Sequence, residues 1–280
     1  MAGYDFSRVS PTAFYPVMAR GEFTDIPFAR EMLAQLEPEL PSLEGMAEGG
    51  MRGYAPFFEA RYKSVSQILI EQGARQILEL ASGFSSRGME WSRRADFKDG
   101  VYVETDLPEM MKHKRALVTA ILGAVPANLK LCCASVLNRG ELEAACASFR
   151  PEPVAVTTEG LLRYLTFAEK EQLAGNVKAI LGKYGGCWIT PDIHTKEWAE
   201  RRKDRAFRER VESNIGRDLD ANYFDDEAQA RRFFESCGFA VEERAMLEGI
   251  RADVVSLAHA SPAMRDQLEG RRTFVLRLSV

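Results

Sequence analysis

The sequence predicts an α/β fold with a doubly wound, mostly parallel sheet of seven strands. Short apolar runs alternate with helical patterns from residue 75 onwards, which is typical of parallel strands joined by helices. The first five runs show little polar alternation, as expected for strands that helices cover on both faces. With 280 residues, of which 46% are hydrophobic, the chain can bury a large core in one α/β domain or in two small ones.

A helix over residues 55–73 precedes this alternation, because Phe58, Tyr62, Val65 and Leu69 repeat at helical spacing. The last two strands are separated by a longer excursion over residues 248–272, so we expect them to pair as an antiparallel edge. The seven predicted strands are residues 75–80, 100–105, 129–134, 153–158, 186–192, 239–247 and 273–279.

Two later helices have clear end signals. Thr166 and Glu169 form a predicted capping box, and Gly182 is the predicted end of that helix. Asp225 is the predicted cap of the second helix and Gly238 its stop. We divide the single predicted domain into an N-terminal lid or substrate region (1–54), a cofactor-binding core (55–193), a helical insertion (194–223) and the C-terminal part of the sheet (224–280).

Composition narrows the class of protein. The net charge is −4 and the pI is about 5.6, which gives no bulk electrostatic case for binding nucleic acid or an anionic membrane. No apolar run approaches the roughly 18 residues of a transmembrane helix, and the first residues lack a signal-peptide pattern. We therefore expect a cytoplasmic protein. The five cysteines contain no C-x-x-C pair and the three histidines are far apart, which does not fit a dedicated zinc site.

The first strand carries a carboxylate, Glu79, and then runs into the small residues Ala81, Ser82 and Gly83. Ligands of open parallel sheets bind beyond the carboxyl ends of the strands, and small side chains allow a ligand to approach the backbone. A dinucleotide-binding G-x-G-x-x-G would place glycine at residues 81, 83 and 86, but Ala81 and Ser86 depart from it. A nicotinamide oxidoreductase is therefore disfavoured.

A carboxylate at residue 79 would repel a diphosphate, but it suits a cationic ligand or the N–H groups of the loop itself. S-adenosylmethionine is such a ligand, because it carries a sulfonium and an ammonium group and no phosphate. A tight strand–helix turn that binds nothing is the alternative for this stretch.

Acids also end the second and fourth strands. Glu104 and Asp106 share the same side of an extended chain, and Asp106 lies 23 residues after Gly83, near the spacing at which a carboxylate binds the ribose of an adenosine cofactor. Glu159 ends the fourth strand at the same edge of the sheet, where it could meet the positive end of the cofactor, and Gly160 leaves room beside it.

Four segments in this order resemble the leucine carboxyl methyltransferase family, which includes polyketide O-methyltransferases. They are EARYKSVSQILI (59–70), QILELASGFSSRG (76–88), YVETDLPEMMKHKRALV (102–118) and TEGLLRYLT (158–166). The family is a branch of the class I S-adenosylmethionine-dependent methyltransferases. The resemblance implies the Rossmann-like fold of that class and S-adenosylmethionine as the cofactor.

The resemblance also implies roles for residues near the first strand. Arg61 matches a clamp for the methionine carboxylate of the cofactor, a group that a guanidinium fork suits well. Ala81 stands in place of the first glycine of the family's turn, and Gly83 matches the second. Arg87 matches an arginine that braces this loop.

Further roles follow for the later segments. Asp106, together with Glu104, is expected to hold the ribose hydroxyls, and Glu159 matches the acid of the "E-G-L-L" motif. Lys114 is expected to be structural. Residues Ala134, Ser135 and Val136 match a segment that touches adenine, with a hydroxyl at Ser135 where relatives have an acid.

The expected function is an S-adenosylmethionine-dependent O-methyltransferase for a hydroxyl or carboxylate of a small molecule. A protein C-terminal carboxyl methyltransferase and a catalytically silent binding module are the alternatives. No catalytic residue is assigned. Four residues are candidates for a base near the acceptor, of which His194 is the best single one: Tyr15, Tyr164, Asp192 and His194. The acceptor and the oligomeric state stay open.

Overall fold

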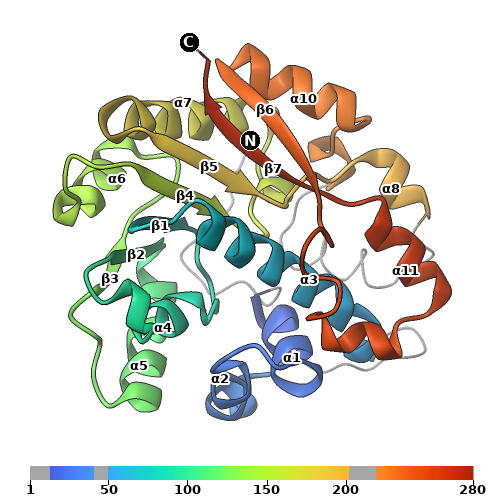
Figure 1. The fold of residues 1–280 in the computed structure, drawn as a ribbon, viewed down its shortest axis with the longest axis horizontal. Coiled ribbons are helices and arrows are strands. Elements are labelled where there is room, and N and C mark those ends of the chain that lie inside the picture. Colours follow the sequence, from blue (N-terminus) through green and yellow to red (C-terminus); the bar gives the residue numbers. More distant parts are fainter. Residues whose placement is uncertain (1–12, 41–49, 202–218, 280) are drawn as a thin grey trace.

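A computed structural model describes residues 13–40, 50–201 and 219–279. Its centre is a seven-stranded sheet with the order β3-β2-β1-β4-β5-β7-β6, flanked by helices (Figure 1). Strands β1 to β5 pair in parallel, whereas β7 is antiparallel to both β5 and β6. The predicted mostly parallel sheet with an antiparallel edge is confirmed.

Each of the seven predicted strands is present. Their bounds are β1 Gln76–Leu80, β2 Val101–Asp106, β3 Leu129–Cys133, β4 Val154–Thr158, β5 Gly186–Thr190, β6 Phe239–Ala245 and β7 Arg272–Leu278. Strands β1 and β4 are buried along their whole length. This burial explains why their sequences do not alternate between apolar and polar residues.

Helices cover both faces of the sheet. The α-helices of the described residues are α1 Phe14–Phe23, α2 Ala29–Leu36, α3 Gly50–Glu71, α4 Arg87–Ser92, α5 Pro108–Leu122, α6 Arg139–Ala145, α7 Phe167–Tyr184, α8 Lys196–Arg201, α10 Glu227–Ser236 and α11 Pro262–Glu269. Single 3₁₀ turns are η2 Glu37–Glu39, η3 Ala95–Phe97, η4 Cys146–Ser148, η5 Leu162–Tyr164, η6 Asp220–Asn222 and η7 Val255–His259. None of these helices is both long and apolar enough to span a membrane.

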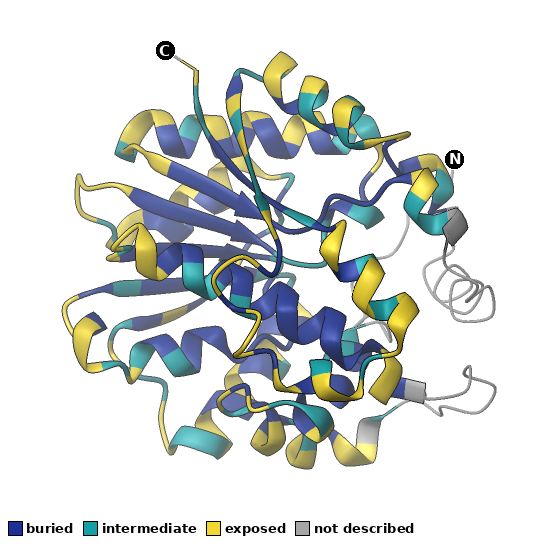
Figure 2. Ribbon diagram, turned by 45° about the vertical axis from the view of Figure 1, so that its right-hand side comes forward, coloured by how far each residue is buried: buried dark blue, intermediate teal, exposed yellow. Residues whose placement is uncertain are grey.

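Successive residues of β1 point to opposite faces and so enter two different cores. Leu78 and Leu80 pack in one apolar cluster with α6, α7 and α10. Ile77 packs in the other with α1 to α5. The buried residues therefore form layers on both sides of the sheet (Figure 2), and exposed residues gather on the outer sides of the helices and in loops.

Two predicted helix ends need correction. The capping box of Thr166 and Glu169 is confirmed, but α7 continues past Gly182 to Tyr184, and Gly185 with φ 76° ends it. A left-handed glycine at the cap stops a helix more firmly than a glycine inside it. Asp226 caps α10 by accepting from the backbone N–H of Gln229. The predicted cap, Asp225, forms an ion pair with Lys196.

Strand β1 lies between β2 and β4, so the chain reverses its direction of progress across the sheet at this point. The carboxyl ends of these three strands therefore share one edge, where ligands of open α/β sheets bind. Of the predicted lid region, α1 packs against both α2 and α3. Most of the predicted insertion 194–223 lies outside the described residues.

Candidate functional site

The loop after β1 is tied to the end of β2. Ala81 and Gly83 both have left-handed backbones, with φ 50° and 49°. The Asp106 carboxylate accepts hydrogen bonds from the N–H of Gly83 at 2.7 Å and from the N–H of Leu107 at 2.8 Å. Burial raises the pKa of Asp106 although these two donors oppose the shift. By accepting from these two backbone N–H groups, Asp106 holds the loop in place at the edge where a ligand would bind.

A buried ion pair between β2 and α5 also supports this loop. Lys114 of α5 lies 2.8 Å from the Glu104 carboxylate and donates to the carbonyls of Gly83 and Ser85. A Cβ at residue 88 would lie 2.1 Å from Oε1 of Glu104, so only glycine leaves room for this carboxylate. Burial raises the pKa of Glu104 to about 7, against the charge of Lys114.

This geometry changes the role expected for Glu104. Its side chain is fully buried, so the carboxylate has no open path to ribose hydroxyls. The structural role expected for Lys114 is confirmed, because its ammonium group joins Glu104 to the loop.

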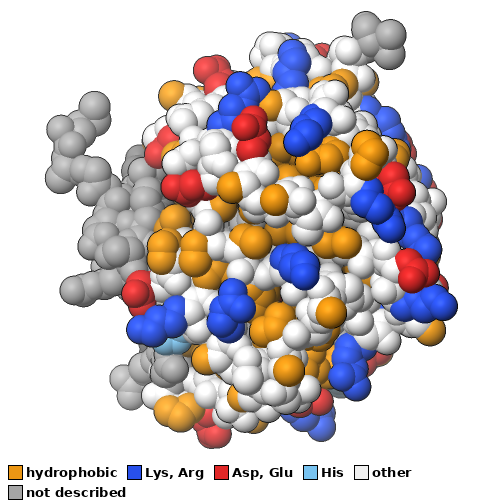
Figure 3. Space-filling view, turned by 90° about the vertical axis from the view of Figure 1, so that its left-hand side faces the viewer, with side chains coloured by type: hydrophobic (Ala, Val, Ile, Leu, Met, Phe, Trp, Pro, Cys, Tyr) orange, Lys and Arg blue, Asp and Glu red, His pale blue; other side chains and the backbone are white. Residues whose placement is uncertain are grey.

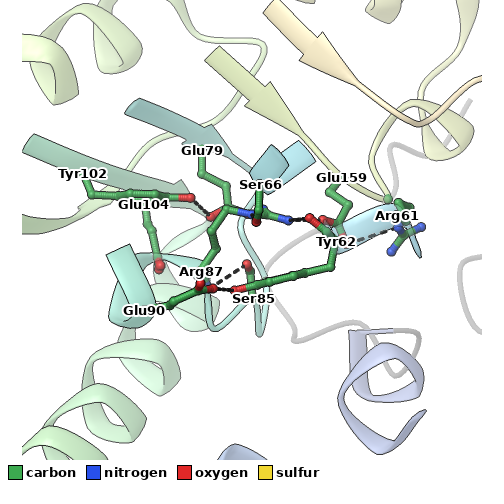
Figure 4. Close-up of polar contacts among 12 residues, drawn as sticks. Arg61, Tyr62, Ser66, Glu79, Ser85, Arg87, Glu90, Tyr102, Glu104 and Glu159 are labelled. Atoms are coloured by element: carbon green, nitrogen blue, oxygen red, sulfur yellow. Dashed lines mark hydrogen bonds and ion pairs between the residues drawn. The ribbon is translucent and has the colours of Figure 1, made fainter. Parts of the chain in front are cut away.

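Arg87 is the centre of a second buried network (Figure 4). Its guanidinium donates to Glu79 at 2.7 Å and to Glu159 at 2.6 Å, and Tyr102 donates to the other Glu79 oxygen at 2.6 Å. The predicted bracing role of Arg87 is confirmed. Both oxygens of Glu79 face these partners, so this residue anchors the loop's arginine in place of the cationic ligand that the sequence suggested.

Glu159 lies where three arginines meet. It accepts from Arg20 of α1, from Nε of Arg61 of α3 at 3.2 Å and from Arg87. Gly160 follows with φ 81°, and a Cβ there would lie 3.3 Å from Nη2 of Arg61. A glycine is therefore required both by the left-handed backbone and by the close approach of the guanidinium.

Asp192, which follows β5, fixes this turn. Its carboxylate accepts from the backbone N–H groups of Gly160 at 2.6 Å and Leu161 at 2.7 Å, and more weakly from Leu162 at 3.4 Å. Asp192, one of the four candidates for a base, therefore has a structural role, because its carboxylate holds this turn. Tyr15 is buried in α1 and Tyr164 is half-buried at the end of η5.

The cluster around Glu159 carries an excess of positive charge. Three guanidinium groups, those of Arg20, Arg61 and Arg87, meet two carboxylates, those of Glu79 and Glu159. Burial lowers the pKa of both Arg20 and Arg61. The neighbouring guanidinium charges add to the effect at Arg20, whereas at Arg61 the charge of Asp192 opposes it. A buried positive excess of this kind is stabilised by an anionic ligand.

Sequence reasoning missed Arg20, which lies 41 residues before Arg61. The one available signal was its position among apolar residues of a helix, since Val17, Met18 and Ala19 beside it are also buried. A charged side chain on a buried helical face needs a partner, but the sequence did not show which one.

The segment after β3 has the predicted small residues. Ala134 and Val136 are buried, and Ser135 is half-buried. The Ser135 hydroxyl accepts from the backbone N–H of Leu137 at 3.3 Å, and the backbone N–H of Ser135 donates to the Glu141 carboxylate at 2.7 Å. A carboxylate is therefore present at this turn, but Glu141 supplies it from α6, a contact that the sequence reasoning did not find.

Comparison with known families gives one match. The profile of the leucine carboxyl methyltransferase family matches residues 18–178, more than half of the chain. The chain belongs to the leucine carboxyl methyltransferase family. The resemblance inferred from the four sequence motifs is thereby confirmed.

Solved structures show the same fold at low sequence identity. A protein from Thermobifida fusca described as a candidate methyltransferase is 16% identical, with 99% of this chain and 97% of that chain covered and a TM-score of 0.62. A DUF574 family protein from Streptomyces avermitilis is 16% identical, with coverage of 98% and 99% and a TM-score of 0.57. The magnesium protoporphyrin IX methyltransferase of Synechocystis, solved with bound S-adenosylhomocysteine, is 9% identical, with coverage of 94% and 99% and a TM-score of 0.52.

These matches establish the fold, and the family match establishes the class of enzyme. The protein is an S-adenosylmethionine-dependent methyltransferase of the leucine carboxyl methyltransferase family. The predicted fold class and enzyme class are confirmed.

Proposed function

We propose that the protein transfers the methyl group of S-adenosylmethionine to a hydroxyl or carboxylate oxygen of a small molecule. The observation that carries the cofactor part of the proposal is the guanidinium excess around Glu159, at the carboxyl ends of β1 and β4. An amino acid carboxylate would offset this excess, and S-adenosylmethionine carries one.

Several polar groups of the site suit this cofactor. Among the described residues, the Arg61 side chain gives only its Nε to a hydrogen bond, which leaves the two terminal nitrogens for a ligand carboxylate. The buried Ser82 hydroxyl has no hydrogen-bond partner in the described part of the chain. A Cβ at Gly83 would meet no atom within 4 Å, so the backbone there is open to a ligand.

The remaining cofactor residues follow from the same edge of the sheet. Each Asp106 oxygen accepts one backbone hydrogen bond and can accept another, so Asp106 can receive ribose hydroxyls. Ala134, Ser135 and Val136 are the proposed adenine contacts. Ala81, Ser82 and Gly83 are the proposed loop contacts, with Arg61 and Glu159 at the amino acid end of the cofactor.

When bound, the sulfonium supplies an activated methyl group, and the protein's part is mainly to position the acceptor and exclude water. Positioning of reacting groups can contribute about 7–11 kcal/mol. A carboxylate acceptor needs no base, whereas a hydroxyl acceptor gains from one. Helix α1 packs on α3 and places Arg20 against Glu159, so the N-terminal helices cover the amino acid end of the site, an arrangement suited to a small acceptor.

Calorimetric titration with S-adenosylhomocysteine and with NAD tests the cofactor assignment. We expect micromolar binding of the first and no binding of the second; the reverse result would end the proposal. Arg61→Ala should weaken S-adenosylhomocysteine binding at least tenfold, about 1.4 kcal/mol, while Arg61→Lys should keep part of the affinity.

Arg75→Ala is the matched control, because Arg75 precedes β1 and so lies at its opposite end, where it is exposed and donates to the carbonyl of Asp96. Circular dichroism shows whether each variant is folded. Unchanged affinity in a folded Arg61→Ala variant would refute the clamp. A methyl-transfer screen with phenols and carboxylic acids then separates an enzyme for small molecules from a silent binding module.

A further inference from the structure

A buried histidine lies next to the turn that carries Gly160. His194 follows β5 and is two residues from Asp192, whose carboxylate holds this turn. Its ring stacks on Tyr223 with the centroids 5.7 Å apart. Its Nδ1 lies 3.1 Å from the carbonyl oxygen of Asp192, and its Nε2 is buried without a hydrogen-bond partner in the described part of the chain.

These contacts fix the tautomer of the ring. A carbonyl oxygen only accepts, so Nδ1 must carry the proton that it shares with the Asp192 carbonyl. Nε2 then presents a lone pair. The backbone of His194 is also fixed, because its carbonyl accepts from the N–H of Phe224 at 3.0 Å.

Burial of the ring, together with the positive charges around it, favours its neutral form. Burial, followed by the charges of Arg163 and Arg271 and more weakly of Arg61, lowers the pKa of His194 well below its ordinary value. Among the described residues, Tyr223 also faces the ring and accepts from Arg163 at 2.8 Å, and the nearby Asp192 carboxylate is occupied by backbone N–H groups. A neutral imidazole is the form that can accept a proton.

Arg163 supplies a second buried atom, its Nε, that can still donate a hydrogen bond. Its Nε has no hydrogen-bond partner among the described residues, and its guanidinium carbon lies 5.8 Å from the centre of the Tyr223 ring on which His194 stacks. The two residues that carry the free lone pair and the unused N–H group therefore both pack against Tyr223. A hydroxyl that gives up its proton and becomes negative satisfies both.

We propose that His194 is the general base for acceptors that react through a hydroxyl group, with Arg163 stabilising the negative charge that develops on the acceptor oxygen. This inference rests on the proposed methyl transfer. The hydroxyl proton passes to Nε2 of His194 while the oxygen lone pair forms the new bond to the methyl carbon. The carbon–sulfur bond breaks with its electron pair going to sulfur, and the imidazolium later releases the proton to solvent.

The ring can be observed directly, since the chain has three histidines. Imidazole ¹⁵N spectra of the full chain saturated with S-adenosylhomocysteine are assigned with the His113→Gln, His194→Asn and His259→Gln variants. We expect His194 to be neutral at pH 7 with its proton on Nδ1, and addition of 4-nitrophenol to shift its Nε2 resonance. An imidazolium at pH 7, a proton on Nε2, or an Nε2 resonance that the phenol leaves in place would overturn the proposal.

Activity on two acceptor classes separates a base from a structural role. His194→Asn should lower kcat for phenols at least 100-fold and leave KM and the methylation of carboxylic acids nearly unchanged. The exposed His259→Asn is the control. Equal losses on phenols and carboxylic acids, or methylation confined to carboxylic acids in the wild type, would overturn the assignment; if neither class is methylated, the ring spectra decide it.

The two failures are distinguishable. If the wild-type protein does not bind S-adenosylhomocysteine, the proposed function fails. If binding is intact and only the histidine results are contrary, the base assignment alone fails.

Discussion

Replacing Arg87 with methionine should destabilise the protein more than any single change at its surface. Arg87 is fully buried and donates to Glu79, Glu159, the carbonyl of Tyr62 at 3.2 Å and the hydroxyl of Ser66 at 3.2 Å. Its guanidinium also lies 4.2 Å from the centre of the Tyr62 ring. Burial opposes its charge, but Glu79 and the surrounding groups raise the pKa of Arg87 above its ordinary value.

The magnitude follows from what the substitution leaves behind. In Arg87→Met, Glu79 keeps only the Tyr102 hydroxyl as a side-chain partner among the described residues, whereas Glu159 keeps Arg20 and Arg61. Removing one member of a buried ion pair costs about 3–5 kcal/mol, because the other charge remains buried. That is a large part of the roughly 5–15 kcal/mol that stabilises a typical domain.

Urea unfolding followed by circular dichroism measures this loss. The double variant Arg87→Met with Glu79→Gln should recover at least about 1 kcal/mol, because it removes the stranded charge. Arg94→Met is the matched control: Arg94 also pairs with an acid, Asp96, at 2.7 Å, but that acid is largely exposed, so a loss below about 1 kcal/mol is expected. A loss below about 1 kcal/mol in Arg87→Met, or no recovery in the double variant, would refute the reasoning.

Three further outcomes are expected from urea unfolding. Ala81→Gly should stabilise the fold by about 0.5–1 kcal/mol, because a left-handed alanine is strained, whereas Ala155→Gly in β4 should destabilise it; a loss in both would contradict the strain. The pKa of Glu104 is raised to about 7, so the folded state binds more protons than the unfolded state between its ordinary pKa and 7. The wild type should therefore lose stability relative to Glu104→Gln as the pH rises from 5 to 7, and parallel curves would contradict this. Asp192→Asn should cost about 2–3 kcal/mol, because its amide group would face backbone donors, and a neutral effect would show that the turn is held otherwise.

The strands were predictable because each one is a property of a few neighbouring residues. Strand β4, residues 154–158, is buried at every position and reads Val-Ala-Val-Thr-Thr without polar alternation, and this pattern is visible without any tertiary information. Helix ends were less predictable where two residues of one kind compete. Asp225 and Asp226 are both suitable caps, and the choice depends on Lys196, 29 residues away, which pairs with the first.

The positions of the strand-end acids were predictable, but the partners of these acids were not. The strand-end acids are found at the expected edge, yet their partners come from distant segments. Whether Glu79 faces a ligand or Arg87 depends on how α4 packs beneath the loop, and Glu104 faces Lys114 because Gly88 leaves the space for it. Such pairings depend on tertiary contacts that spacing along the chain does not contain.

The distribution of charge between elements explains why the N-terminal helices matter for the site. The strand ends and α4 alone bring together Glu79, Glu159 and Arg87, which leaves one negative charge in excess. Arg61 from α3 and Arg20 from α1 convert this into one positive charge in excess. Among these paired groups, the positive excess on which the proposed carboxylate site rests therefore depends on two helices that precede the sheet in the sequence and pack against each other.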